Sequence, residues 1–404
     1  MGFRLKPTVS LRQYADEAYI FDAARFELYK IDSRALEFVS GKLESATLAD
    51  LSADECTFVN SCLDRSLLEV ETHQPGLGRA QHGFTRSHLP VHEAPLYLLI
   101  HITEKCNLRC GHCYLGEKHA RCLTIEEVTK AIAEFAQMGG LTVLISGGEP
   151  LLHPQFSQIN DLVGRFPLRF ELLTNGTLLT NAVVDSLQFH EVQVSIDGWG
   201  RSHDELRGTG SFARSMKAIE AVCERGIACS VATMITKHNA ESDDDFLSLE
   251  RFCLTNSISN WSVTAPCEIG CWAEEGAVAE RARSIEITSR FGYGEGQHDF
   301  GLKYACGANL LTLMYDGSAI GCVLQPEIVY GSLSEGLARS WERRNPVLVR
   351  DTECADCKYL DLCRGGCRVA ARESSGSLLG KDLLQCAAVD TLMRGLSADA
   401  IERR

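Results

Sequence analysis

Residues 96–114 read LYLLIHITEKCNLRCGHCY, an apolar run followed by a polar loop with three cysteines, Cys106, Cys110 and Cys113. The apolar run at 96–103 has the length of a buried β-strand. Three thiols in one short loop can be disulfide partners, zinc ligands or ligands of an iron–sulfur cluster. Because a structural metal site normally has four ligands, three cysteines leave one coordination position to explain.

The region after this loop repeats the strand pattern. Further apolar runs lie at 141–148, 169–176, 191–198, 228–236 and 260–266, with helical stretches between them. One such stretch, 124–138, opens with Thr124 and Glu127 in capping-box spacing. Six βα units of about 30 residues predict parallel strands with right-handed crossovers. Six units are too few for an eight-fold barrel, so we expect an α/β fold with a partial (β/α)6 barrel and its chemistry at the carboxyl ends of the strands.

Both flanks of this region have different patterns. Residues 1–74 combine strand-like pieces at 18–23 and 25–31 with helical stretches around 33–42 and 52–65, and they close with the strand-like SLLEVET. The segment 73–95 is rich in Gly, Pro and His without periodicity, which predicts a linker. Past about residue 300 the βα rhythm breaks, and seven of the 18 cysteines follow. We expect a small domain there that is held together by metal.

Composition limits the classes of function. The chain has 404 residues, 45% of them hydrophobic, and a net charge of −14, which argues against a nucleic-acid-binding surface. The sequence contains no run of about 18 apolar residues, so no membrane-spanning helix is predicted. The N-terminus lacks the apolar stretch of a secretory signal. We therefore expect a cytoplasmic protein with reduced thiols. In a chain of this length, many cysteines favour metal chemistry over a disulfide scaffold.

The stretch ITEKCNLRCGHCY resembles the cluster loop of the radical S-adenosylmethionine (SAM) enzymes. The resemblance implies that Cys106, Cys110 and Cys113 hold a [4Fe–4S] cluster whose fourth iron is chelated by SAM. One electron would then cleave SAM to methionine and a 5′-deoxyadenosyl radical. On spacing alone, a zinc site with His112 or His119 as its fourth ligand remains the alternative.

Other predicted strand ends match the family's SAM-binding motifs. The resemblance implies that SGGEP (146–150) binds the amino group of SAM, with glycines that let the backbone approach the ligand closely. It also implies contacts to the ribose and methionyl carboxylate near the fourth strand end, and adenine beside His112. Taken alone, Arg207 is more often a surface ion pair. The expected SAM contacts are His112, Ser146, Gly147, Gly148, Glu149, Thr174, Asn175, Ser195, Asp197 and Arg207.

The C-terminal cysteines resemble the SPASM domain, an extension of radical SAM enzymes with two auxiliary [4Fe–4S] clusters. The resemblance implies that the ligands are Cys306, Cys322 and Cys367 for the first cluster and Cys354, Cys357, Cys363 and Cys386 for the second. The first cluster is one ligand short, since Phe300 stands where some relatives have a cysteine. Cys267 and Cys271, after the sixth strand, are candidate ligands, catalytic hydrogen-atom donors or ordinary thiols. Alternatively, the cluster keeps an open iron.

The N-terminal pattern resembles the small winged-helix-like domain that recognises precursor peptides in ribosomal-peptide biosynthesis. The expected division is a recognition domain (1–74), a linker (75–95), a radical SAM barrel (96–299), a SPASM domain (300–390) and a tail (391–404). We interpret the chain as a peptide maturase with three [4Fe–4S] clusters and SAM, which crosslinks a precursor peptide by a thioether or carbon–carbon bond. Its reductant would be a flavodoxin or ferredoxin.

Three enzymatic alternatives need the same SAM apparatus: peptide epimerisation, sulfatase maturation and tetrapyrrole modification. An iron–sulfur electron-transfer protein without SAM chemistry is the alternative from a different class. Intact CNLRCGHC and SGGEP motifs count against that last interpretation.

Overall fold

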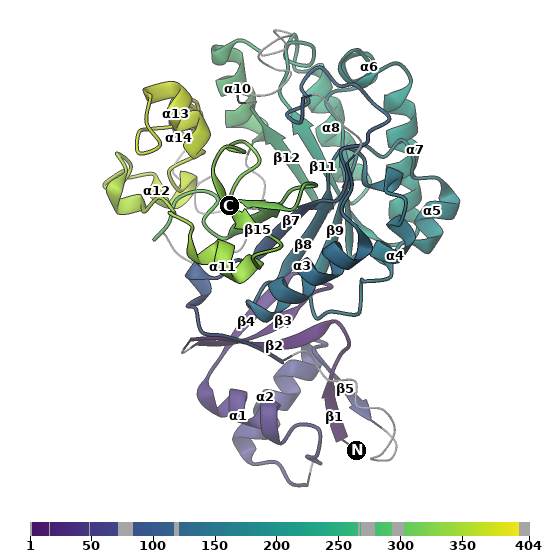
Figure 1. The fold of residues 1–404 in the computed structure, drawn as a ribbon, viewed down its shortest axis with the longest axis vertical. Coiled ribbons are helices and arrows are strands. Elements are labelled where there is room, and N and C mark those ends of the chain that lie inside the picture. The colour runs from purple at the N-terminus through teal and green to yellow at the C-terminus, as the bar shows by residue number, and fades with distance from the viewer. Residues whose placement is uncertain are drawn as a thin grey trace.

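The computed structural model describes residues 2–15, 17–47, 49–71, 84–116, 121–265, 267, 279–292 and 303–395. Three positions named above, His119, Cys271 and Phe300, lie outside the described residues. The chain forms a central sheet with helices packed against it, a smaller N-terminal unit below and a C-terminal helical group at one side (Figure 1).

All six predicted barrel strands are present. They are β7 (Tyr97–His101), β8 (Thr142–Ser146), β9 (Arg169–Thr174), β10 (Glu191–Ser195), β11 (Ala228–Met234) and β12 (Asn260–Thr264). They pair in parallel and in chain order, within a nine-stranded sheet of order β12-β11-β10-β9-β8-β7-β13-β14-β15. This arrangement fits the predicted partial barrel.

The last three strands of that sheet come from the region that was expected to lack the βα pattern. β13 (Leu310–Leu313) pairs in parallel with β7, and β14 (Ser318–Ile320) and β15 (Val329–Ser332) follow in antiparallel order. The beginning of the cysteine-rich region therefore extends the barrel sheet. Its buried Leu311 and Leu313 share one apolar core with the barrel strands, so metal is not needed to attach this part of the chain.

A shared apolar core joins the sheet to the helices α3 (Ile125–Gln137), α4 (Phe156–Asn160), α5 (Asn181–Ser186), α7 (Ser211–Glu224) and α8 (Asp244–Thr255). The short helix α6 (Arg201–Arg207) packs beside α7. The predicted capping box starts α3, because Thr124 accepts from the backbone of Glu127 and the Glu127 carboxylate accepts from the backbone of Thr124. α3 then buries Ile132 and Phe135 against the sheet.

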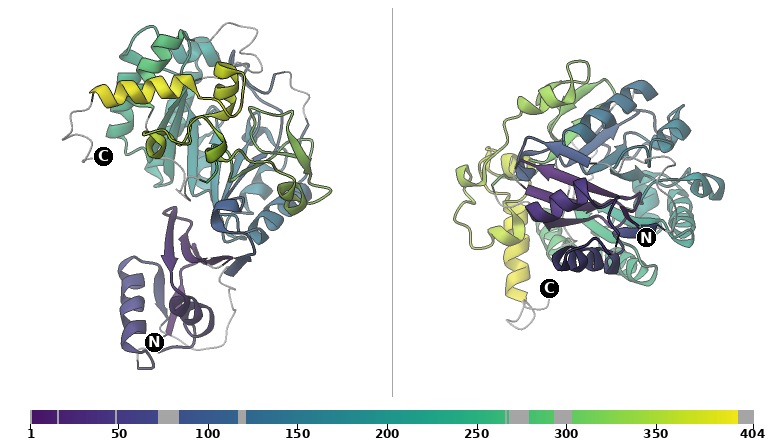
Figure 2. Two further views of the ribbon diagram at one scale, coloured as in Figure 1. Left: turned by 90° about the vertical axis from the view of Figure 1, so that its left-hand side faces the viewer. Right: turned by 90° about the horizontal axis from the view of Figure 1, so that it is seen from below.

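The N-terminal unit contains two small sheets and two helices (Figure 2). One sheet pairs β1 (Gly2–Leu5) with β5 (Leu68–Glu71), and the other has the order β4-β3-β2-β6. Its remaining elements are β2 (Val9–Tyr14), β3 (Glu17–Asp22), β4 (Glu27–Ile31), α1 (Ser33–Gly41), α2 (Ala53–Asp64) and β6 (Phe84–Ser87). β6 lies in the predicted linker, 75–95, and pairs in parallel with β2. The second half of that segment is thus part of the sheet.

The turn between β3 and β4 closes the floor of the barrel, at the amino ends of its strands. The Arg169 side chain donates to the backbone oxygens of Ala23 (2.8 Å) and Ala24 (3.1 Å). The Phe26 ring lies under the Arg169 guanidinium, at 5.2 Å, and against the Tyr97 ring. The N-terminal unit is therefore joined to the barrel by hydrogen bonds and ring contacts as well as by the chain.

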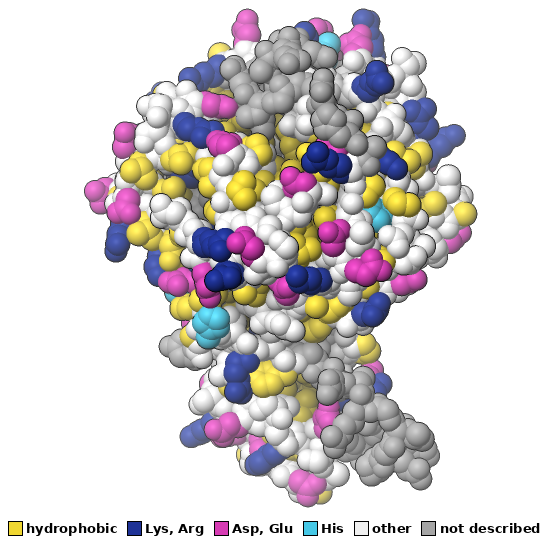
Figure 3. All heavy atoms as spheres, in the orientation of Figure 1, with side chains coloured by type: hydrophobic (Ala, Val, Ile, Leu, Met, Phe, Trp, Pro, Cys, Tyr) yellow, Lys and Arg dark blue, Asp and Glu magenta, His cyan; other side chains and the backbone are white. Residues whose placement is uncertain are grey.

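The remaining helices are α10 (Arg281–Phe291), α11 (Leu337–Glu342), α12 (Leu360–Cys363), α13 (Arg368–Ser375) and α14 (Leu383–Gly395). α14 continues past residue 390, the predicted start of the tail, and packs against α10 and α13. Among the described helices, none combines the length and apolar character that a membrane span requires. On the face shown in Figure 3, acidic and basic side chains are interspersed.

Candidate functional site

The three cysteines of the first motif lie in the loop that follows β7, at the mouth of the barrel. The backbone N–H of Leu108 donates to the Cys106 sulfur, and that of Gly111 donates to Leu206 at the end of α6. Burial, with the nearby Cys106 and Cys113, raises the pKa of Cys110 to about 11. The structure therefore gathers the three thiols, as a shared cluster requires.

The SGGEP turn packs against the beginning of the cysteine loop. A Cβ atom on Gly147 would lie 2.4 Å from the Thr103 oxygen, and one on Gly148 would lie 2.3 Å from the Lys105 oxygen. Both contacts are too short for any side chain. From the sequence, we expected these glycines to allow the close approach of a ligand. In the structure they allow the close approach of the backbone at Thr103 and Lys105, and this contact positions the loop one residue before Cys106.

Glu149 connects this turn to the next strand end. It is fully buried, and its carboxylate accepts from the Thr174 hydroxyl (2.7 Å) and from the backbone N–H of Asn175 (2.9 Å). Burial raises its pKa, opposed by these hydrogen bonds. The Asn175 side chain in turn donates to Asn107 of the cysteine loop, at 3.0 Å. Four residues thus tie the loop to the ends of β8 and β9.

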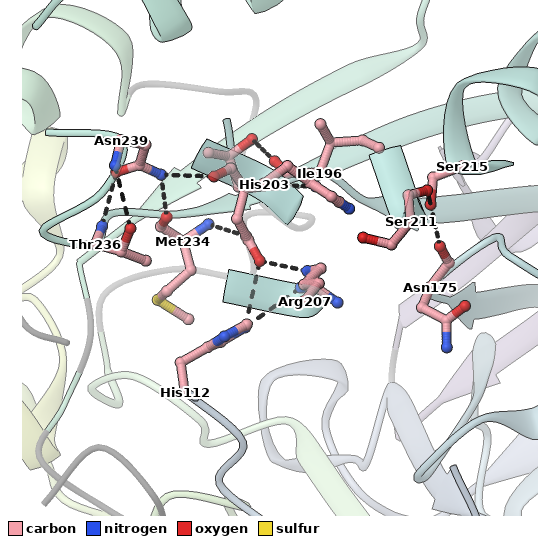
Figure 4. Close-up of polar contacts among 12 residues, drawn as sticks. His112, Asn175, Ile196, His203, Arg207, Ser211, Ser215, Met234, Thr236 and Asn239 are labelled. Atoms are coloured by element: carbon pink, nitrogen blue, oxygen red, sulfur yellow. Dashed lines mark hydrogen bonds and ion pairs between the residues drawn. The ribbon is translucent and has the colours of Figure 1, made fainter. Parts of the chain in front are cut away.

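A second buried network lies across the mouth, at the end of β10. The Arg207 guanidinium, at the end of α6, pairs with the Asp197 carboxylate and also lies 3.3 Å from Nε2 of His112 (Figure 4). Nε2 of His112 is 3.4 Å from Asp197. Three of the predicted SAM contacts therefore meet one another, and Arg207 is no surface ion pair.

Neighbouring elements hold Asp197 ionised. Burial alone would raise its pKa, but the charge of Arg207, with smaller contributions from His112 and His203, holds it at about 2. Its carboxylate also accepts from the backbone N–H of Met234, at 2.8 Å. Asn239 donates to the backbone oxygens of Asp197 and Met234 and so joins the ends of β10 and β11 (Figure 4).

This network borders a cavity of about 510 Å³ at the barrel mouth. Its lining includes Ser195, the three network residues, Cys267, Cys367 and residues of α14. Ser146, Glu149 and Thr174 do not line it. The cavity joins the predicted SAM-binding region to the C-terminal cysteines.

The C-terminal cysteines, which were assigned to two sets, have other cysteines as neighbours. In the first, the Cys367 thiol lies within hydrogen-bonding reach of Cys306, and Cys322 is close enough to raise the pKa of Cys306. In the second, burial raises the pKa of Cys386 to about 11, with contributions from the other three thiols, Cys354, Cys363 and Cys357.

The Asp382 carboxylate stands between the two sets. It accepts from the backbone N–H of Cys367, at 3.0 Å, and influences the pKa of Cys363 and Cys386. Within the described ranges, no group of three or more His, Cys, Asp or Glu side chains could hold a metal ion. The ligands of a four-iron cluster bind separate irons, so they need not converge on one point as the ligands of a single zinc ion do.

Sequence reasoning missed several residues of this region. Tyr114, directly after the third cysteine, lines the cavity and hydrogen-bonds to the buried His101 at 3.0 Å. The adjacency of Tyr114 to the CGHC motif was the available signal. The roles of Asn239 and Asp382 could not be predicted from neighbouring residues, because each forms its hydrogen bonds with residues distant in the sequence.

Comparisons with known proteins agree with this geometry. The model of the radical SAM superfamily matches residues 100–253. The mycofactocin maturase MftC of Mycobacterium ulcerans is 28% identical over 69% of this chain and 84% of that protein. The subtilosin biosynthesis protein AlbA of Bacillus subtilis is 32% identical over 53% of this chain and 52% of that protein.

The fold has relatives among solved structures. Streptococcus suis SuiB, crystallised with its precursor peptide SuiA, superposes with a TM-score of 0.64 at 16% identity, over 94% of this chain and 98% of SuiB. The chain therefore contains a radical SAM domain over residues 100–253.

Proposed function

We propose that this enzyme modifies a ribosomally made precursor peptide, forming a thioether or carbon–carbon crosslink after hydrogen abstraction. The observation that carries the proposal is the mouth cavity, which is lined by the Asp197–Arg207–His112 network and also by Cys267 and Cys367. The names of the relatives support a peptide substrate: two are a maturase and a bacteriocin biosynthesis protein, and SuiB was crystallised with a precursor peptide.

The residues of the mouth have distinct roles in this proposal. Cys106, Cys110 and Cys113 would hold a [4Fe–4S] cluster, which would supply the electron for the cleavage of SAM. Arg207 keeps Asp197 ionised and oriented toward the cavity, where a carboxylate accepts hydrogen bonds from ribose hydroxyls.

His112 presents a neutral ring to the adenine base, because burial lowers its pKa to about 4. Glu149, Thr174 and Asn175 position the cysteine loop. Two further clusters, on the two C-terminal cysteine sets, complete the proposed cofactors, and a flavodoxin or ferredoxin is the proposed reductant.

The N-terminal unit is the proposed binding site for the leader of the peptide. In the sheet order β4-β3-β2-β6, β4 is an edge strand, and an extended peptide can add to such an edge by main-chain hydrogen bonds. α1 and α2 border a pocket of about 470 Å³. Its lining is mostly charged or polar and includes Phe38 and Phe58, so it offers both polar and apolar contacts to a peptide side chain.

Anaerobic reconstitution followed by reduction tests the SAM chemistry. We expect 5′-deoxyadenosine from the wild-type chain and none from the variant Cys106→Ala, Cys110→Ala, Cys113→Ala. Absence of the nucleoside in the wild type would refute the enzyme mechanism.

Coexpression with a short peptide encoded beside the gene, followed by mass spectrometry, tests the product. A loss of two hydrogens supports the crosslink, and an unchanged mass with an inverted residue favours epimerisation. Hydrogen exchange tests the leader site: we expect peptide to protect residues 27–31 of β4 but not 84–87 of β6, the opposite edge.

A further inference from the structure

Cys267 lies directly beyond β12, the last strand of the parallel barrel, and is 9% exposed. Its surroundings differ from those of an ordinary buried cysteine. Cys253, on α8, is equally buried (8%) and belongs to the main apolar core. In the described part of the chain, Cys267 belongs to none of the apolar core clusters and instead borders the mouth cavity with Asp382 and Gln385.

The thiol of Cys267 also has specific neighbours. It lies within hydrogen-bonding reach of the Cys367 thiol, which is in similar reach of Cys306. The nearby Cys322 raises the pKa of Cys306. All four thiols are free. Cysteines that are 100 residues apart in the chain, at positions 267 and 367, are therefore neighbours in space.

We propose that Cys267 is the fourth ligand of the first auxiliary cluster and completes the set Cys306, Cys322 and Cys367. This inference rests on the proposed SPASM-type clusters. Binding exchanges the thiol proton for an iron–sulfur bond and transfers no electron. It gives the cluster four thiolates, so no iron remains open to a substrate thiolate, and Cys267 is no longer available as a hydrogen-atom donor.

The position of Cys267 explains why sequence spacing leaves this cluster one ligand short. The other three ligands belong to the C-terminal region, whereas Cys267 belongs to the barrel. The cluster would thus join the end of β12 to the loop before α13 (Arg368–Ser375). A spacing rule that counts only along the C-terminal domain cannot identify a ligand that the barrel supplies.

Iron content and spectroscopy of the full chain test the assignment without any turnover. In the background Cys106→Ala, Cys110→Ala, Cys113→Ala, only the auxiliary clusters remain, and we expect about eight irons per chain. Adding Cys267→Ala should remove about half of this iron or convert one cluster to a form that binds added 2-mercaptoethanol, with a changed EPR spectrum of the reduced protein. Cys253→Ala in the same background should change neither iron nor spectrum.

Each other outcome is also decisive. Unchanged iron and an unchanged EPR spectrum in the Cys267→Ala background would overturn the assignment. If that variant does not fold, Cys267→Ser decides: a ligand oxygen shifts the g values of one cluster, and an unchanged spectrum overturns the proposal. A background with Cys267 intact that holds no iron would instead refute the auxiliary clusters themselves, and with them the proposed function.

Discussion

A buried arginine–carboxylate network lies at each end of the barrel, and the two networks are completed differently. At the floor, Arg169 contacts Glu171, Glu191 and two backbone oxygens of the β3–β4 turn. At the mouth, Arg207 contacts Asp197 and His112 beside a cavity of about 510 Å³. The floor arginine is surrounded by the chain itself, which indicates a structural role. The mouth arginine borders space for a ligand.

Loss of the floor arginine should have the largest effect. Arg169→Met leaves the partly buried Glu171 and Glu191 without their cation, so we expect the free energy of unfolding to fall by about 3 kcal/mol. Urea denaturation measures this. Arg165→Met, at an exposed position just before β9, is the control and should stay within about 0.5 kcal/mol of wild type. If Arg169→Met lowered the free energy of unfolding by less than about 1 kcal/mol, the proposed structural role of Arg169 would be wrong.

The mouth arginine should instead affect chemistry. Arg207→Met leaves Asp197 without its partner and shifts the network that borders the cavity, so we expect 5′-deoxyadenosine formation to fall about 100-fold or more. Arg201→Met, an exposed position on the same helix, should change the rate less than about twofold. Equal rates in the two variants would show that the mouth network does not serve the reaction.

Protonation should weaken both ends alike. Burial lowers the pKa of His203, at the mouth, and of His190, at the floor, to about 4. As the pH falls, the histidines of the unfolded chain bind protons before those of the folded chain. The free energy of unfolding is therefore unaffected by each histidine above pH 6.5 and decreases as the pH falls from 6.5 toward 4. We expect about 2 kcal/mol per histidine between pH 6.5 and 5, measured by urea denaturation. His190→Gln should make that pH dependence smaller, and an unchanged slope would contradict this account.

The smallest effect should come from an exposed cap. Thr124→Ala removes the hydroxyl that caps α3 just after the cysteine loop, so we expect a loss of about 1 kcal/mol in unfolding free energy. Thr124→Ser keeps the hydroxyl and should restore most of the loss. If the serine variant were as unstable as the alanine variant, the capping interpretation would be wrong.

Local patterns predicted the barrel because its strands are apolar runs bounded by turns, and the cysteine motifs because their spacing is short. The failures have nonlocal causes. β2 was not predicted, since its Arg12 looks like a surface residue but is buried, with contacts to Thr85 and Pro167. β6 was assigned to a linker because its only pairing partner, β2, lies about 70 residues away. The same reason hides the approach of Cys267 to Cys367.

The contacts between the β3–β4 turn and the barrel floor have a consequence for the design of chimeric proteins. Phe26 occupies the floor together with Ala23 and Ala24, so the N-terminal unit and the barrel share one interlocking surface. Removing the N-terminal unit from this chain would leave Arg169 and its two glutamates without their cover, and a recipient barrel would need a floor that fits the transplanted turn. A functional exchange needs the turn and the floor residues moved as a set, or a recipient barrel whose floor already matches.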